Sequence, residues 1–172
     1  PPPPPPAAAE PPELPETEVD DEPPLPPTRA YRLTRLASKW GLPASLNDGS
    51  VDLPEILSDD ALAGATEVQL HAYLLDLDFI VEACPALSRV PKVLVIHGDG
   101  LCERASCLTM AEHTGRFTLL APPIPGGQGP VYHPKMILIR SESRLAIHIT
   151  SANLTRSEFS AKTNAVWSGC FE

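Results

Sequence analysis

Apolar and polar residues alternate in several short segments of the chain. The clearest are residues 66–75 (TEVQLHAYLL) and the pair 131–140 and 144–150. Alternation at every second residue is typical of a strand with one buried face. The unbroken apolar run within residues 90–100 (VPKVLVIHGDG) is instead typical of a central strand buried on both faces. The pattern predicts strands over these segments and a further one over residues 116–121 (RFTLLA).

Helices are predicted before and between these strands. Ser50 is an acceptable N-cap for a short helix that ends near Leu57, although Glu55 comes too late to complete a capping box with it. Asp76 or Asp78 is placed to cap a longer helix in LDFIVEACPAL.

A third helix is predicted in residues 101–115 (LCERASCLTMAEHTG), closed by Gly115 as a left-handed C-cap. Residues 122–130 hold too many prolines and glycines for a regular element and form a loop. Alternating strands and helices predict an α/β fold in which a β-sheet is sandwiched between helices. The closing hairpin in residues 131–150 makes this sheet mixed.

Composition separates the first residues from the remainder of the chain. Residues 1–27 hold 13 of the 22 prolines, seven acidic residues and no basic one. Such a segment buries too little apolar surface to offset its ordering entropy, so we expect a disordered, acidic, proline-rich tail. Residues 28–172 then hold 15 acidic and 13 basic residues, a net charge of −2. We expect a polar lead-in over 28–49 and the folded domain over 50–172.

The cysteines and the hydropathy pattern indicate a reducing compartment and no membrane. The four cysteines have irregular spacing that fits neither a disulfide framework nor paired zinc ligands. No apolar run approaches the roughly 18 residues of a membrane helix. The cysteines are Cys84, Cys102, Cys107 and Cys170.

The predicted hairpin brings polar groups together at the start of its first strand. His133 and Lys135 are two residues apart, so on a strand their side chains share a face. A turn in Ser141–Ser143 makes paired positions sum to 285 or 286. Position 133 then lies opposite 152 or 153, which brings Asn153 beside His133.

An imidazole, an ammonium and a carboxamide together suit phosphate chemistry. A neutral His133 can attack phosphorus, while Lys135 and Asn153 stabilise charge on the non-bridging oxygens. These groups need no metal or other cofactor. The alternative, a solvated lysine at a strand edge beside an ordinary polar histidine, stays open on these residues alone.

The wider pattern resembles a known family. HPK, the strand RLAIHIT, then SANL and KTNAVW, with 20 residues from His133 to Asn153, are similar to the first half of the tyrosyl-DNA phosphodiesterases of the phospholipase D superfamily. The likeness includes VQLHAYLLDLDFIVEACP and PKVLVIHGD upstream and covers roughly residues 50–170. The superfamily's usual Asp five residues after the lysine is Arg140 here, a loss typical of the tyrosyl-DNA branch.

The resemblance implies a phospholipase D-like half-domain and a mechanism. His133 would attack the phosphodiester between a DNA 3′ end and a tyrosine or peptide, and water would hydrolyse the phosphohistidine. Lys135 and Asn153 would bind the phosphoryl oxygens. Ser151, Lys162 and Asn164 would help to bind the substrate, Asn164 standing where the family commonly has Gln. A nuclear DNA-repair enzyme is implied.

One part of that active site is absent from the sequence. The family has a second His-x-Lys motif whose histidine protonates the leaving tyrosine, and none of the other four histidines has Lys two places on. Because the chain starts with prolines rather than Met, we expect a piece of a longer enzyme whose other half completes the site. The alternatives are a homodimer with one motif per chain, or a non-catalytic module that binds nucleic acid or a partner.

Three other polar candidates are interpreted as structural. His148 lies inside a predicted strand and is expected to be a core histidine. His97 precedes Gly98 at the end of a buried strand, where a turn is expected. Cys102, Cys107 and His113 supply only three possible zinc ligands.

Overall fold

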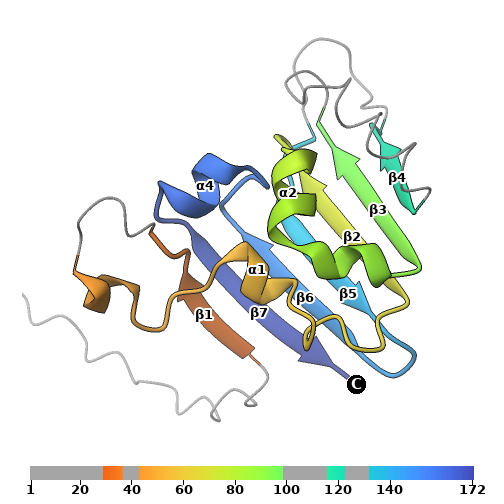
Figure 1. Cartoon of the computed structure of the whole chain (residues 1–172), viewed down its shortest axis with the longest axis horizontal. Helices are drawn as coiled ribbons and strands as arrows, with labels where there is room; N and C mark the ends of the chain where they lie inside the picture. The colour runs from red at the N-terminus through yellow and green to blue at the C-terminus, as the bar shows by residue number, and fades with distance from the viewer. Residues whose placement is uncertain (1–28, 37–42, 99–115, 123–131) are drawn as a thin grey trace, which may run out of the picture.

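A single mixed sheet organises the chain. The computed structural model describes residues 29–36, 43–98, 116–122 and 132–172 (Figure 1). Within these residues, seven strands occur in the order β1-β7-β6-β5-β2-β3-β4. Their bounds are β1 Arg29–Leu33, β2 Glu67–Ala72, β3 Lys92–His97, β4 Phe117–Leu120, β5 Met136–Arg140, β6 Leu145–Thr150 and β7 Ala165–Phe171.

Strand direction changes in the middle of the sheet. β2, β3 and β4 are parallel to one another, whereas β2–β5, β5–β6, β6–β7 and β7–β1 are antiparallel pairs. Parallel neighbours need a crossover connection, and α2 provides one between β2 and β3. The predicted mixed α/β sheet is therefore confirmed.

Burial alternates along the strands and divides the sheet into two faces. Val68, Leu70 and Ala72 of β2 are fully buried, and so are their lateral neighbours Val93 and Val95. On the opposite face of β3, Lys92 is exposed and Leu94 and Ile96 are half-buried, so β3 does not have the two fully buried faces that its apolar run predicted. We call the buried face the inner face and the opposite one the outer face.

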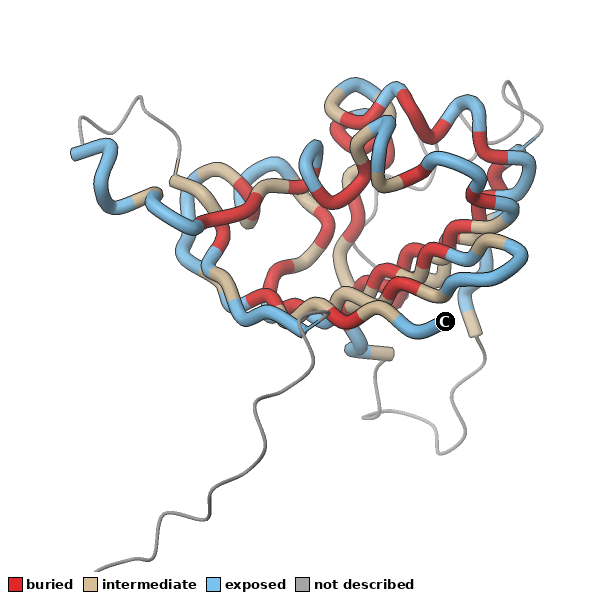
Figure 2. The backbone as a smooth tube through the Cα atoms, turned by 90° about the horizontal axis from the view of Figure 1, so that it is seen from below, coloured by how far each residue is buried: buried red, intermediate tan, exposed pale blue. Residues whose placement is uncertain are grey.

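The described helices cover the inner face (Figures 1 and 2). Residues 101–115 lie outside the described residues, so the helix predicted there and a second helical layer stay predictions. The helices are α1 Leu53–Ile56, α2 Leu77–Ala83 and α4 Arg156–Ser160, with short 3-10 turns η2 Ala44–Asn47 and η3 Pro85–Arg89.

Capping explains where these helices start. Asp76 accepts a hydrogen bond from Phe79 N and caps α2, as one of the two predicted options. The cap of α1 is Asp52 rather than the predicted Ser50. Asp52 and Glu55 form a complete capping box, which the sequence interpretation excluded because it placed the helix start two residues too early.

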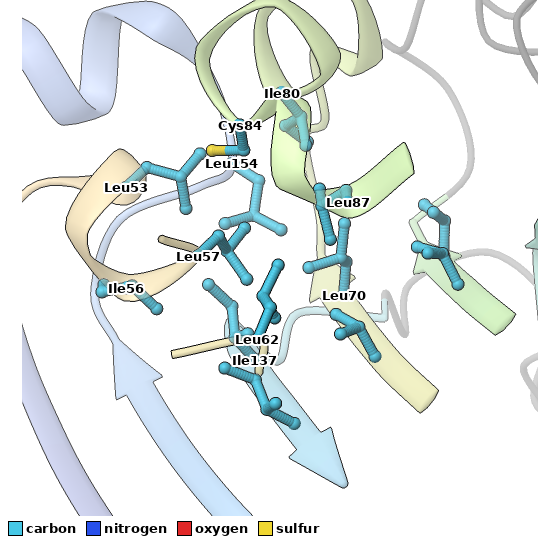
Figure 3. Close-up of a cluster of buried hydrophobic side chains, with 14 of the residues drawn as sticks. Leu53, Ile56, Leu57, Leu62, Leu70, Ile80, Cys84, Leu87, Ile137 and Leu154 are labelled. Carbon is cyan, nitrogen blue, oxygen red and sulfur yellow. The ribbon is translucent and has the colours of Figure 1, made fainter. Parts of the chain in front are cut away.

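The core lies between the helices and the inner face (Figure 3). Leu53 and Leu57 around α1 and Ile80 of α2 meet Leu70 and Ile137 of the sheet, and each is at most 1% exposed. Burying such side chains contributes roughly 1.5–3 kcal/mol each. The core fixes the strand ends that carry the polar residues considered below.

The predicted polar lead-in also contributes to the sheet. β1 pairs antiparallel with β7, and Thr34 forms a bridge with Val51. Residues 29–33 therefore belong to the same sheet as β2–β7. The predicted tail over 1–27 lies outside the described residues.

Candidate active site

The candidate site lies where β5 begins and β6 ends. β5 starts at Met136, five residues later than the predicted strand, so His133 and Lys135 lie in the lead-in to the strand. Pro134 has no N–H to give to a ladder, which is consistent with this late start. Met136 pairs with Ile149, so paired positions sum to 285, one of the two predicted values.

Lys135 lies against His133. Its Nζ is 3.0 Å from Nδ1 and 3.2 Å from Nε2 of the imidazole, and it donates to the His133 carbonyl at 3.2 Å. Lys135 is 9% exposed, whereas His133 is an exposed residue. A ligand that approaches the exposed imidazole from solvent therefore comes close to the buried Lys135 ammonium.

Burial and a nearby carboxylate act in opposite directions on this charge. Burial lowers the pKa of Lys135, and the smaller effect of Glu158 raises it. The ammonium is thus partly desolvated, and this strengthens its interaction with an anion.

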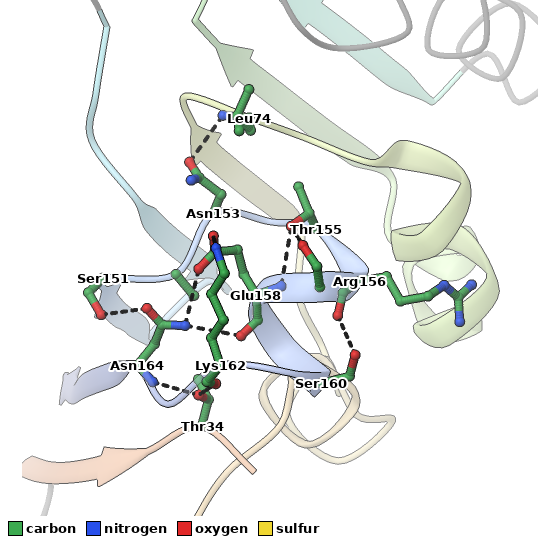
Figure 4. Close-up of polar contacts among 12 residues, drawn as sticks. Thr34, Leu74, Ser151, Asn153, Thr155, Arg156, Glu158, Ser160, Lys162 and Asn164 are labelled. Atoms are coloured by element: carbon green, nitrogen blue, oxygen red, sulfur yellow. Dashed lines mark hydrogen bonds and ion pairs between the residues drawn. The ribbon is translucent and has the colours of Figure 1, made fainter. Parts of the chain in front are cut away.

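The end of β2 links His133 to Asn153. The rings of Tyr73 and His133 have centroids 5.3 Å apart. The next residue, Leu74, donates its N–H to Asn153 Oδ1 at 3.1 Å (Figure 4). With its oxygen held in this way, Asn153 presents Nδ2, which has no hydrogen-bond partner among the described residues.

Glu158 gathers two of the other predicted site residues (Figure 4). Lys162 Nζ lies 2.5 Å from Glu158 Oε1, and Asn164 Nδ2 donates to Glu158 O at 3.0 Å and Oε2 at 3.2 Å. Ser151 Oγ donates to Asn164 Oδ1 at 2.9 Å. The carboxamide of Asn164 is therefore oriented by the protein at both ends.

Three neighbours of the site were not predicted to belong to it. Glu158 lies on α4 and Tyr73 just beyond β2, and nothing in their local sequence indicates contact with His133 or Lys135. The third is Gly98: a Cβ there would lie 2.9 Å from the Tyr132 carbonyl oxygen and would collide with the Tyr73 ring. Only a glycine lets these two segments approach so closely.

The polar groups interpreted as structural have structural partners. His148 bonds Ser168 Oγ at 2.8 Å, and burial together with Arg32 and Arg144 lowers its pKa to about 4. His97 is buried and its Nδ1 lies 3.0 Å from the Gly98 carbonyl.

Neither a metal cluster nor a membrane helix is found in the described part of the chain. No three His, Cys, Asp or Glu side chains of these residues are grouped as a metal ion requires. No helix there has the length and hydropathy to cross a bilayer. Cys102, Cys107 and His113 lie outside the described residues.

Two sequence comparisons find similar proteins. Residues 34–169 match a family model described as tyrosyl-DNA phosphodiesterase. Tyrosyl-DNA phosphodiesterase 1 of Arabidopsis thaliana is 27% identical over 133 residues, which cover 77% of this chain and 21% of the plant protein. The chain thus spans about a fifth of that relative's length.

Solved structures share the fold. The yeast tyrosyl-DNA phosphodiesterase superposes with a TM-score of 0.60 at 16% identity, over 81% of this chain and 32% of the yeast chain. Nuc from Salmonella typhimurium, a phospholipase D family member, gives 0.51 at 20% identity over 82% of each chain. At these identities the likeness shows the fold alone, and it is the phospholipase D-like fold that the motif pattern implied.

Proposed function

The chain belongs to the tyrosyl-DNA phosphodiesterase family, and on that premise we propose that it carries the nucleophile of a phosphodiester hydrolase acting in DNA repair. The proposed substrate is the bond between a DNA 3′ end and a tyrosine or peptide. The observation that supports it most is the contact of the exposed His133 imidazole with the buried Lys135 ammonium.

The first step is a displacement at phosphorus. A neutral nitrogen of His133 attacks, a P–N bond forms, and the bond from phosphorus to the tyrosine oxygen breaks. The electron pair leaves with that oxygen, which takes a proton from a general acid. Water then attacks the phosphohistidine, the P–N bond breaks, and a DNA 3′-phosphate is released.

Lys135 and Asn153 have complementary roles. The ammonium meets the non-bridging oxygens beside His133, and Asn153 Nδ2 donates to the charge that grows there. Glu158 of α4 connects the other predicted residues to the site. It binds Lys162 and Asn164, and Asn164 in turn accepts from Ser151. The negative charge of Glu158 also acts on Lys135.

The general acid must come from elsewhere. Since His133 has the only His-x-Lys in the sequence, we propose that a second such motif is supplied by further chain or by a second copy. The proposed place of action is the nucleus, where the DNA is.

The test uses two substrates with the 172-residue chain. One is an oligonucleotide with a 3′-phosphotyrosine, and the other carries a 3′-(4-nitrophenyl) phosphodiester, whose more acidic phenol leaves without a proton. We expect slow cleavage of the first, faster cleavage of the second, and loss of both in His133→Ala. A chelator should leave the rates unchanged, because the proposed groups need no metal.

A matched control variant distinguishes cleavage by this chain from cleavage by a contaminating enzyme. Glu142→Gln changes an exposed residue in the β5–β6 turn, at the other end of the hairpin, and should leave the rate unchanged. Cleavage that persists in His133→Ala would exclude the proposed function. DNA binding without cleavage of either substrate would favour a non-catalytic module.

A further inference from the structure

A line of hydrogen bonds runs along the outer face of β2 and ends beside the proposed nucleophile. Tyr132, the residue before His133, has its hydroxyl 2.5 Å from His71 Nδ1. His71 Nε2 lies 3.2 Å from Gln69 Oε1, and Gln69 Nε2 donates to Glu67 Oε1 at 2.6 Å. Lys92 closes the line with its ion pair to Glu67 at 2.8 Å.

The carboxylate at one end determines where each proton lies. Glu67 only accepts, so Gln69 must turn its NH₂ toward it and its oxygen toward His71. His71 therefore carries its proton on Nε2, and Nδ1 accepts. Tyr132 is then the donor, and every bond in the line has one donor and one acceptor.

The acid–base properties of both residues agree with this direction. Burial lowers the pKa of His71, which favours the neutral imidazole that an acceptor nitrogen requires. Burial raises the pKa of Tyr132, so its hydroxyl keeps the proton that it donates. His71 is 8% exposed, so water competes little for this bond.

The backbone around His133 has few other anchors. In the described part of the chain, the backbone of residues 132–135 makes one backbone hydrogen bond, from Thr150 N to Lys135 O at 3.0 Å. The β2–β5 ladder ends at the His71–Met136 pair. Tyr132 thus ties the lead-in to β2 four residues before β5 starts.

We propose that Tyr132 and His71 are positioning residues that hold the His133 imidazole against Tyr73 and Lys135. The inference rests on the proposed function, because it explains how that nucleophile is oriented. The two contacts with β2 are adjacent: His71 holds the Tyr132 side chain, and Tyr73, two residues beyond His71, packs on His133. When the bond between His71 and Tyr132 is lost, the His133 imidazole is no longer held against the Tyr73 ring.

Four variants isolate the hydrogen bond. Tyr132→Phe removes the hydroxyl and keeps the ring, and His71→Leu removes the acceptor. His71→Asn keeps an acceptor near the place of Nδ1 and should restore most of the effect. Tyr31→Phe is the matched control, since it removes the same hydroxyl from a tyrosine that is 77% exposed on β1.

The kinetic readout is the single-turnover rate on the 4-nitrophenyl substrate. We expect Tyr132→Phe and His71→Leu to lower the rate at saturation roughly 10-fold with KM little changed, because the lost bond orients the nucleophile and does not bind substrate. His71→Asn and Tyr31→Phe should stay near wild type. Equal rates in all four variants would overturn the inference while the proposed function stands.

A second readout does not depend on catalysis. Proton NMR should show a nuclear Overhauser effect between the rings of Tyr73 and His133 in the wild type, weakened in Tyr132→Phe and His71→Leu. An unchanged effect in both would refute the positioning role even if the chain proves inactive, whereas inactivity of the wild type alone would refute only the proposed function.

Discussion

Lys135 Nζ lies within 3.2 Å of both ring nitrogens of His133, and the lysine is buried while the histidine is exposed. The same ammonium also donates to the His133 carbonyl at 3.2 Å. A phosphate that reaches His133 therefore has a cation already in place.

Lys135 should determine the basic side of the pH profile. Burial lowers its pKa, so its charge, and with it kcat/KM, is lost as pH rises through a value below the ordinary lysine range. Lys135→Met should lower kcat/KM by about 10²–10³-fold at neutral pH. Lys135→Arg keeps a charge at every accessible pH, so a basic limb that persists unchanged in this variant would assign it to another group.

Removal of the Glu158 charge should tighten anion binding. Glu158→Gln keeps an acceptor for Asn164 and Lys162 but removes a negative charge that acts on Lys135. We expect the Kd for a 3′-phosphorylated oligonucleotide to fall about 3- to 10-fold at low salt and less at high salt.

The pH profile of Glu158→Gln gives a second test of the effect of Glu158 on Lys135. Because Glu158 raises the pKa of Lys135, its neutralisation should move the basic limb to lower pH. A Kd and a pH profile both equal to wild type would contradict the proposed electrostatic role of Glu158.

Gly98→Ala should displace Tyr73, which packs on His133, although Gly98 itself takes no part in the proposed chemistry. The added Cβ collides with the Tyr73 ring and lies 2.9 Å from the Tyr132 carbonyl oxygen. Overpacking of this kind costs about 1–3 kcal/mol, so Tm should fall and the Tyr73–His133 ring contact should be lost. The double variant Gly98→Ala/Tyr73→Ala removes the larger collision and should recover part of the Tm; no recovery would place the strain elsewhere.

His148 should make the fold sensitive to acid. Its pKa is about 4 in the folded protein against an ordinary 6.5, so the unfolded chain binds more protons between these values. Stability is complete above pH 6.5 and is lost as pH falls toward 4, by an amount on the order of 3 kcal/mol. Urea unfolding of His148→Asn, which can still bond Ser168, should show a smaller loss over this range, and an equal loss would contradict the assignment.

The sequence predicted what depends on short-range pattern. Strand alternation and a three-residue turn were enough for the mixed sheet, and they limited the hairpin register to two values, one of which pairs Met136 with Ile149. Tyr132, which precedes His133, reaches His71 on the outer face. His148 was expected to be a core histidine; it is half-buried and bonds the Ser168 side chain, so only its structural role agrees with the expectation.

What depends on contacts between distant segments could not be predicted. The partners Tyr132 and His71 are 61 residues apart, and Leu74 and Asn153 are 79 apart. No periodicity connects such positions. β1 was missed for a related reason: its burial pattern is almost entirely exposed, since it is an edge strand and its pairing with β7 is what defines it.

The proposed covalent bond between His133 and phosphorus can be detected by mass spectrometry of the trapped chain. The 3′-(4-nitrophenyl) oligonucleotide substrate is mixed with the 172-residue chain, quenched in alkali, which preserves phosphohistidine, and digested. We expect a nucleotidyl adduct on the peptide that contains His133 and none in His133→Ala. Release of 4-nitrophenol with no adduct on His133 at any time would contradict it.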